Sequence, residues 1–409
     1  MRRWQVTMWS QEPGRPKRVH PPSHGALSLS RMKMLSIAAV VVSGTVALAG
    51  CSSGGGAQSD PNSSQGAANA DCSNLQQVAR WDLDRRLAQL LMGAVYSDSG
   101  ETAINAAVKA IAKGQVGGVN FLGESSYAYS NNELAQAVDA GGEVPPFLAV
   151  DEEGGRVQRL GDEVGYVPSA REMAATMSPD EVRQEARRIG KAMKKLSLNM
   201  DLAPVVDVSD QAEYEVIGDR SFSDNPQTVT KYAGAFAEGL QDQNIVPVLK
   251  HFPGLGSGSG NTDFESATTP PLRKLERKDL IPYETLLQQT PVAVMLTNAK
   301  VPGLTAGKPA SLSPATYELL RSQYGFQGVV MTDSLSAAAV QDNTDTAGAV
   351  AKAIVAGADI ALWDRLSDVK QIHKRLNRAV KSGDLTEERI NESVNRVLEL
   401  KGVDLCTGR

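Results

Sequence analysis

Residues 146–156 read Pro-Phe-Leu-Ala-Val-Asp-Glu-Glu-Gly-Gly-Arg, a short apolar run that ends in charged residues and glycines. A run of this length, bounded by turn residues, is typical of a buried strand in a parallel sheet. Seven further runs of the same kind recur along the chain, with amphipathic stretches between them. We predict eight strands, at Leu90–Val95, Val116–Leu122, Pro146–Asp151, Asn199–Pro204, Ile245–Phe252, Val292–Asn298, Val329–Asp333 and Asp359–Trp363.

Helical segments lie between these runs, among them Pro179–Leu196, Pro226–Gln243 and Thr346–Ala356. The first two open with Ser-Pro and Asn-Pro pairs, which suit the start of a helix. Strands that alternate with helices in this way predict an α/β fold, a single-domain (β/α)8 barrel of the TIM type. The rival fold, an open doubly wound sheet, favours a GxGxxG phosphate loop after its first strand, and the glycine pairs of this chain lack that spacing.

The first 50 residues have the pattern of an N-terminal extension followed by a signal peptide. Arg31 and Lys33 precede the apolar stretch 35–47, which is too short to span a bilayer comfortably. Small residues then lead to Cys51 and resemble the lipobox of bacterial lipoproteins. We expect cleavage before Cys51 and its acylation, so that residues 51–72 form a flexible linker from the extracytoplasmic face of the cell membrane to a domain at 73–409. The alternatives are an uncleaved anchor or a cysteine that is there by chance.

Removal of this segment would change the formal charge from −5 to −11, because its residues include seven Lys and Arg and one Glu. An acidic protein of this kind is not expected to bind nucleic acid. Two of the four histidines are lost with it, which leaves no histidine cluster for a metal, and we expect neither metal nor cofactor. Cys72 and Cys406 remain, and in an oxidising compartment we expect them to form a disulfide, the alternative being two free thiols.

Charged residues follow three of the predicted strands. Asp151 ends the third strand, Lys250 and His251 lie at the end of the fifth, and Asp333 ends the seventh. The active site of a (β/α)8 barrel lies at the C-terminal ends of its strands. Each residue alone also has an ordinary explanation, such as a Ca²⁺ or Mg²⁺ site near Asp151, a buried hydrogen-bonded pair at 250–251 or a helix N-cap at Asp333. Together they predict a pocket rich in carboxylates.

Five stretches in this order resemble glycoside hydrolase family 3, and within it the short single-domain β-N-acetylhexosaminidases that act on peptidoglycan-derived N-acetylglucosaminides. They are residues 149–160, 203–208, 217–223, 250–254 and 319–333. The resemblance implies that Asp333 is the nucleophile of a retaining glycosidase, which attacks the anomeric carbon and forms a covalent glycosyl-enzyme. It also implies five sugar-binding residues: Asp151, Arg159, Arg220, Lys250 and His251.

The loop after the fifth strand departs from the family pattern. Single-domain relatives carry Asp-Ser-His in this loop, and the histidine protonates the leaving oxygen. Here the three positions are Asn261, Thr262 and Asp263, and Leu255 replaces a preceding histidine of the motif. Because general acid catalysis contributes roughly 10²- to 10⁴-fold, a replacement matters, and we expect Asp263, or else Glu265, to act as the acid/base.

Three classes of function remain. The first is a monomeric glycosidase that releases terminal β-linked N-acetylglucosamine from cell-wall-derived saccharides. The second is a pseudoenzyme that binds peptidoglycan sugars but does not cleave them, because the histidine is missing. The third, a solute-binding lipoprotein, predicts two hinged lobes, whereas one uninterrupted series of eight strands favours a single barrel.

Overall fold

The structure is a computed structural model that describes residues 72–123, 133–289, 291–342 and 344–407. The predicted extension and signal peptide at 1–50, the acylation of Cys51 and the linker that follows it lie outside these residues, apart from Cys72 itself. No helix in the described ranges combines the length and the apolar character needed to cross a bilayer.

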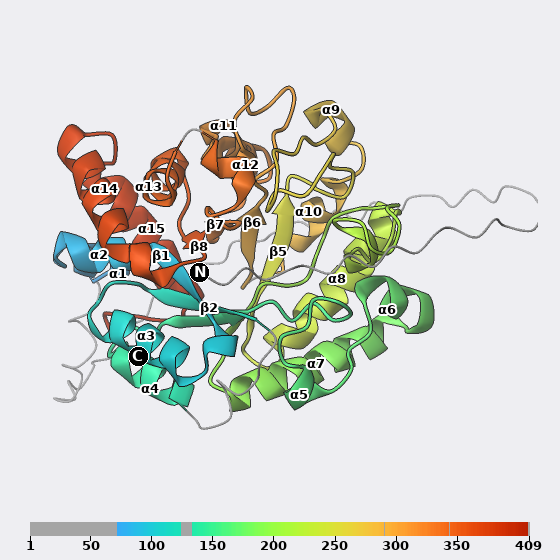
Figure 1. The fold of residues 1–409 in the computed structure, drawn as a ribbon, viewed down its shortest axis with the longest axis horizontal. Helices are drawn as coiled ribbons and strands as arrows, with labels where there is room; N and C mark the ends of the chain where they lie inside the picture. Colours follow the sequence, from blue (N-terminus) through green and yellow to red (C-terminus); the bar gives the residue numbers. More distant parts are fainter. Residues whose placement is uncertain (1–71, 124–132, 290, 343, 408–409) are drawn as a thin grey trace, which may run out of the picture. The chain divides into compact units, whose positions relative to one another are not determined.

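Eight parallel strands form one sheet in the order β7-β6-β5-β4-β3-β2-β1-β8 (Figure 1). A parallel bridge between Met331 and Ile360 brings the two end strands together and closes the barrel. Each predicted run overlaps one strand, and β1 alone extends one residue beyond its run, so the prediction of a (β/α)8 barrel is confirmed. The strands are β1 (Leu91–Tyr96), β2 (Gly118–Leu122), β3 (Phe147–Val150), β4 (Met200–Asp201), β5 (Val246–Phe252), β6 (Ala293–Leu296), β7 (Val330–Thr332) and β8 (Ala361–Trp363).

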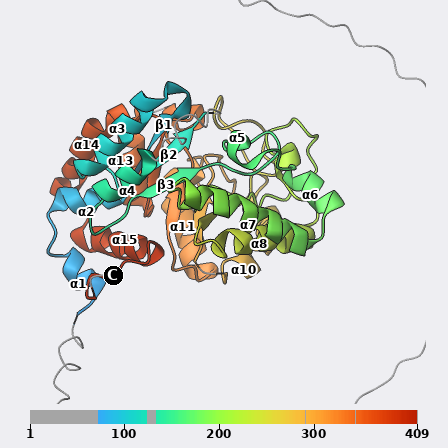
Figure 2. The same ribbon diagram turned by 90° about the horizontal axis from the view of Figure 1, so that it is seen from below.

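Helices occupy the connections and surround the strands, and α7 and α8 lie side by side with α10 next to α8 (Figures 1 and 2). The helices are α1 (Asn74–Val78), α2 (Leu83–Gln89), α3 (Glu101–Ala112), α4 (Glu133–Ala140), α5 (Gly161–Val164), α6 (Ala170–Thr176), α7 (Pro179–Lys195), α8 (Pro226–Gln241), α9 (Leu272–Leu275), α10 (Ile281–Leu286), α11 (Pro314–Glu318), α12 (Ala338–Gln341), α13 (Thr346–Ala356), α14 (Val369–Ser382) and α15 (Glu387–Leu400). Shorter helical turns include η3 (Gly218–Arg220) and η4 (Ala310–Leu312).

The starts of the long helices follow from their capping residues. Ser178 accepts a hydrogen bond from the Glu181 N–H, and the Glu181 side chain accepts one from the Ser178 N–H, which completes a capping box around Pro179. Asn225 is the N-cap of α8 in the same way, and it directly precedes the proline that begins the helix. These caps explain why the predicted and observed starts of α7 and α8 coincide.

The core has two layers. Apolar side chains from every strand except β2, or from the immediate flanks of these strands, fill the barrel interior, and a larger layer separates the strands from the helices. Trp363, at the end of β8, belongs to the outer layer and is fully buried. The interior residues include Met92, Phe147, Ala149, Met200, Val248, Met295, Met331 and Leu362.

A buried aspartate reinforces the seam between β7 and β8. Asp359 donates its N–H to the Val330 carbonyl at 2.8 Å, and its carboxylate accepts the Val330 N–H at 2.9 Å. The same carboxylate pairs with Arg321 at 2.5 Å and with Arg396 at 3.3 Å. These contacts add to the other hydrogen bonds of the seam, among them those from the Thr332 N–H to the Ile360 carbonyl at 3.1 Å and from the Leu335 N–H to the Leu362 carbonyl at 2.8 Å.

A disulfide joins Cys72 to Cys406, whose Cα atoms are 5.9 Å apart. Asn74 adds two hydrogen bonds across the same junction: its amide donates to the Val403 carbonyl and its oxygen accepts from the Leu405 N–H. The beginning and the end of the described chain are therefore fastened to each other.

Candidate active site

The charged residues at the ends of β3 and β5 form one ion cluster. The Lys250 ammonium lies 2.7 Å from Asp151 and 2.6 Å from Glu153. Arg220, from η3, donates two hydrogen bonds of 2.7 and 2.8 Å to Glu153. Burial alone would raise the pKa of Glu153, but Arg220 and Lys250 outweigh it and hold that pKa well below its usual range. Glu153 therefore stays ionised and fixes both cations.

A bulge in β5 presents two consecutive side chains to the site. Successive residues of a strand normally point to opposite faces. The ladder with β6 shifts between Lys250 and Phe252, so that the residue between them has no counterpart on β6. Lys250 and His251 are both buried and both contact carboxylates at the C-terminal end of the barrel.

His251 is held by a fully buried aspartate. Its Nδ1 lies 2.7 Å from the Asp207 carboxylate, which also accepts the Leu255 N–H at 2.6 Å. Within the described part of the chain, no hydrogen bond involves Nε2 of His251, so this nitrogen is free to meet a ligand hydroxyl. Asp207 thus orients the ring and fixes the start of the loop after β5.

Asp333 lies directly after β7. Its Oδ1 accepts the Ser334 N–H at 2.7 Å, and its own N–H donates to the Leu296 carbonyl at 2.9 Å. Burial raises the pKa of Asp333; His251 opposes that rise and Asp263 adds to it. The N-cap explanation for Asp333 is wrong, because the next helix, α12, starts only at Ala338.

A further carboxyl group, which the sequence analysis did not single out, lies beside Asp333. Asp364 follows β8 and accepts a hydrogen bond from the Ser334 hydroxyl. Burial, and then the charge of Asp333, raise the pKa of Asp364 despite that hydrogen bond. Tyr96, at the end of β1, belongs to the same group, because burial and then Asp364 and Asp263 raise the pKa of its phenol.

Asp263 is carried by the loop after β5, and this loop is fastened to the segment after Asp333. The Ala338 N–H donates to the Asp263 carbonyl at 3.2 Å, and the Ala339 N–H donates to the Thr262 carbonyl at 3.0 Å. Asp263 is exposed as a whole residue, yet the surrounding protein withdraws water from its carboxyl group. That desolvation, followed by the charge of Asp364, raises the pKa of Asp263.

Two of the candidate residues form no hydrogen bond or ion pair with this arrangement in the described part of the chain. No hydrogen bond or ion pair within the described ranges joins the Arg159 side chain to the ion cluster, and its Nε has no partner there. The N–H groups of Arg159 and Leu160 donate instead to buried Glu152, at 2.7 and 2.8 Å. Glu265 is exposed, and its carboxylate lies against Gly260.

Residues 82–400 match the family model described as the glycosyl hydrolase family 3 N-terminal domain. The chain belongs to glycoside hydrolase family 3. It is 44% identical over 331 residues to the β-hexosaminidase LpqI of Mycobacterium tuberculosis, which covers 79% of this chain and 84% of that protein. The prediction of a family 3 glycosidase is thereby confirmed.

Solved structures agree with this assignment. A structure of M. tuberculosis LpqI superposes with a TM-score of 0.76 at 43% identity, over 81% of this chain and 97% of that one. A family 3 β-N-acetylglucosaminidase from Paenibacillus sp. superposes with a TM-score of 0.72 at 30% identity, over 79% of this chain and 62% of that one.

Within this family 3 chain, the leucine that replaces a motif histidine has a structural role. Leu255 is 3% exposed and packs in a small apolar cluster with Val205, Ile217, Ala267 and Ala299. The next residue, Gly256, approaches Val208 so closely that a Cβ there would lie 2.3 Å from the Val208 carbonyl oxygen. The loop that carries Asp263 is therefore anchored at its start by apolar packing.

Proposed function

We propose that the protein is a retaining β-N-acetylhexosaminidase that releases terminal β-linked N-acetylglucosamine from cell-wall-derived saccharides. One observation carries this proposal: Asp333 and Asp263, on different loops at one end of the barrel, lie beside the cluster of Asp151, Lys250 and Arg220. The names of the relatives support the substrate class.

Asp333 is the proposed nucleophile. Its Oδ1 is occupied by the Ser334 N–H, which leaves Oδ2 for attack on the anomeric carbon. A bond forms between that carbon and Asp333 while the glycosidic carbon–oxygen bond breaks. Water then attacks the same carbon from the opposite side and releases Asp333, so that the configuration of the sugar is retained.

Asp263 is the proposed acid/base. In the first step it gives its proton to the leaving oxygen, and in the second it takes a proton from the attacking water. Its raised pKa supports this role, because a general acid must hold a proton near neutral pH. Glu265 is less suited, because its carboxylate is exposed and lies against Gly260.

The ion cluster is the proposed sugar-binding surface. Asp151 has acceptor oxygens for sugar hydroxyls, and the free Nε2 of His251 offers a further polar contact. Lys250 and Arg220 hold the carboxylates in place through Glu153. Arg159, whose Nε lacks a partner in the described ranges, is the proposed additional donor.

The first experiment tests hydrolysis and its stereochemistry. Purified protein is assayed on an aryl N-acetyl-β-glucosaminide and on muropeptide disaccharides, beside Asp333→Ala, and the first-formed anomer is identified by proton NMR. We expect the β-anomer from the native protein and no reaction from Asp333→Ala. Sugar binding without hydrolysis above the Asp333→Ala background would establish the pseudoenzyme instead.

The second experiment tests the acid/base. Asp263→Asn should slow aryl glycosides with poor leaving groups far more than dinitrophenyl glycosides, and azide should restore its rate. Glu265→Gln, the matched control, should leave both rates unchanged. In a separate variant, Asn261→Asp, Thr262→Ser and Asp263→His rebuild the family sequence and should keep activity on poor leaving groups. Equal losses on both kinds of substrate in Asp263→Asn would exclude Asp263 as the acid.

We also propose that the protein is a monomer anchored by lipid at Cys51 to the extracytoplasmic face of the cell membrane. Support comes from the sequence pattern before Cys51. Labelled fatty acid should be incorporated into the native chain and not into Cys51→Ala, and the detergent-solubilised protein should have the mass of one chain in light scattering. Equal labelling of both chains would overturn the anchor.

A further inference from the structure

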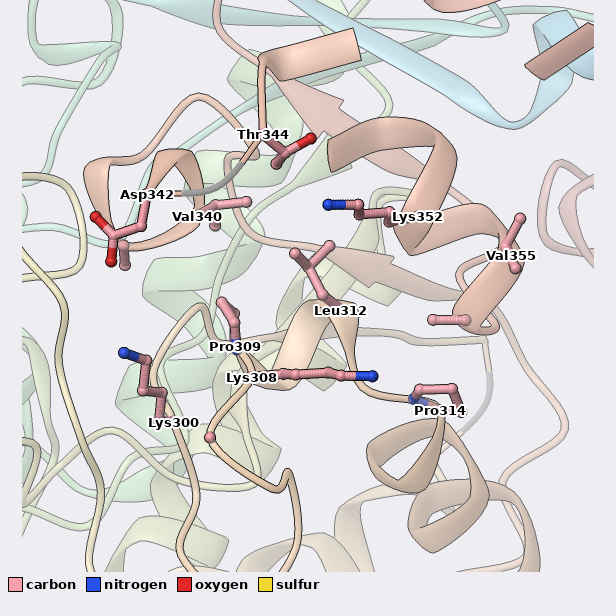
Figure 3. A pocket seen from close by; sticks show the side chains of 13 residues that line it. Lys300, Lys308, Pro309, Leu312, Pro314, Val340, Asp342, Thr344, Lys352 and Val355 are labelled. Carbon is pink, nitrogen blue, oxygen red and sulfur yellow. The ribbon is translucent and has the colours of Figure 1, made fainter. Parts of the chain in front are cut away.

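A hollow of about 440 Å³ is lined by residues that follow β6 and β7 in the sequence, outside the ion cluster (Figure 3). It lies between the segment after β6, η4, α12 and α13. None of the proposed catalytic or sugar-binding residues lines it. Its volume lies within the range of pockets that enclose small organic ligands.

Three lysines line this hollow: Lys300, Lys308 and Lys352. Within the described ranges, none of the three forms an ion pair. Asp342 is the single acid among the lining residues that the structure describes, so the hollow has an excess of positive charge in a chain whose formal charge is −5. A local positive field of this kind attracts anions.

The floor of the hollow is apolar. In Figure 3, Lys308 and Lys352 lie on opposite sides of Leu312, and Val340 and Pro309 lie beside it. An inorganic anion would leave these apolar side chains in contact with water. An organic anion would cover them with its body while its charged groups meet the lysines at the rim.

We propose that this hollow is a binding site for an organic anion that has an apolar body and at least two negatively charged groups. Lysine ammonium groups are point charges without the fork geometry of arginine, so they can donate hydrogen bonds to carboxylate, sulfate or phosphate groups alike. Lys308 and Lys352 lie on either side of Leu312 in Figure 3, and one charged group for each of the two ammonium groups gives the two charged groups of the proposed ligand.

The occupant would touch segments that also hold the catalytic carboxylates. Ala339 lines the hollow, and its N–H fastens the loop of Asp263 through Thr262. At the floor, Leu312 follows Ser311, whose hydroxyl donates to the Asn298 side-chain oxygen, and the Asn298 amide donates to the Ser334 carbonyl. Hydrogen bonds therefore connect the segments that line the hollow to the loop that carries Asp263 and to Ser334, the residue after Asp333.

The test is calorimetric titration of the full-length protein with 2,6-naphthalenedicarboxylate, its uncharged dimethyl ester and inorganic phosphate. We expect one dicarboxylate to bind per chain, at least about tenfold more tightly than the ester or phosphate, because only the dicarboxylate supplies both charge and apolar surface. The naphthalene bisphosphate then distinguishes a phosphate from a carboxylate ligand.

Paired variants locate the site. Lys308→Gln with Lys352→Gln should weaken dicarboxylate binding about tenfold or more, because two charge-assisted contacts are lost. Lys191→Gln with Lys231→Gln, on exposed positions of α7 and α8, makes the same change of charge and should have no effect. Equal weakening in both variants, equal binding of the ester, or no saturable binding at millimolar dicarboxylate would overturn the proposal. Because binding is measured without substrate, these outcomes are independent of the glycosidase assays.

Discussion

The hydroxyl group of Ser334 donates a hydrogen bond to Asp364, and the N–H of the same residue donates to Asp333. One serine thus holds the carboxyl groups that follow β7 and β8 next to each other. Asp263 reaches the same region from the loop after β5. Neighbouring like charges disfavour ionisation, so this group of carboxyls favours retention of a proton, as a glycosidase without the family histidine requires.

Asp364→Asn should move the alkaline limit of activity to lower pH. The charge of Asp364 raises the pKa of Asp263, and its removal lets Asp263 lose its proton earlier. The measurement is the pH dependence of kcat/KM on an aryl N-acetylglucosaminide. Asp384→Asn, an exposed change of the same charge, should leave the profile in place. An unchanged alkaline limit in Asp364→Asn would separate Asp364 from the acid/base step.

Leu255→Ala should loosen the loop that carries Asp263. Truncation of a buried leucine costs about 2–5 kcal/mol, and here the loss falls on a small cluster at the start of the loop. We expect faster amide hydrogen exchange at 255–268 and a lower kcat/KM. Leu75→Ala, at an exposed leucine, is the control. Unaltered exchange in the loop would show that the cluster does not anchor it.

Glu152→Gln should flatten the pH dependence of stability between about pH 4.5 and 7. Burial raises the pKa of Glu152 to about 7. Between about pH 4.5 and 7 the folded state therefore holds a proton on Glu152 that the unfolded state has released. The folding stability that this proton contributes is fully present below the unfolded pKa and is lost as the pH rises through 7. The effect is of the order of 3 kcal/mol. Urea unfolding from pH 5 to 8.5 measures it, with exposed Glu163→Gln as the control; parallel curves for Glu152→Gln and the native protein would contradict it.

Asp359→Asn should destabilise the barrel much more than the loss of a surface ion pair. The fully buried carboxylate balances Arg321 and Arg396 at the β7–β8 seam, and breaking such a buried pair costs about 3–5 kcal/mol. Asp345→Asn removes an exposed pair with Arg375 and should cost less than about 1 kcal/mol. The measurement is the free energy of unfolding in urea. Similar losses in both variants would mean that Asp359 contributes little to closure.

The strands could be predicted because parallel strands buried on both faces give unbroken apolar runs. Their ends could not, because a ladder also needs backbone partners. The run Asn199–Pro204 contains only the two residues of β4, although single backbone hydrogen bonds continue beyond them, from the Leu202 N–H to the Val150 carbonyl and from the Val248 N–H to the Ala203 carbonyl. The run at Thr346–Ala356, where an aspartate cap and a glycine mark the two ends, was predicted with its observed bounds.

The site residues could be predicted where a charged side chain lies at the C-terminal end of a strand. Asp151 and Asp333 directly follow β3 and β7, and Lys250 and His251 lie in the last residues of β5, so all four are at the C-terminal ends of alternate strands of the barrel. Asp364 also follows a strand, so the same rule contained the signal for it. Glu153 and Asp207 gain their roles from partners far along the chain, and no local pattern indicates that Glu153 accepts from Arg220 or that Asp207 accepts from His251.

The bond between Cys72 and Cys406 turns the described domain into a covalent ring. A single cut by a protease in any exposed loop of such a ring releases no fragment, so a nicked molecule keeps all eight strands attached to one another. A pull on the chain before Cys72 is passed directly to Cys406, and α1 is not peeled from α15. If the domain is tethered through Cys51 as proposed, a force on the tether would therefore reach both ends of the fold at once.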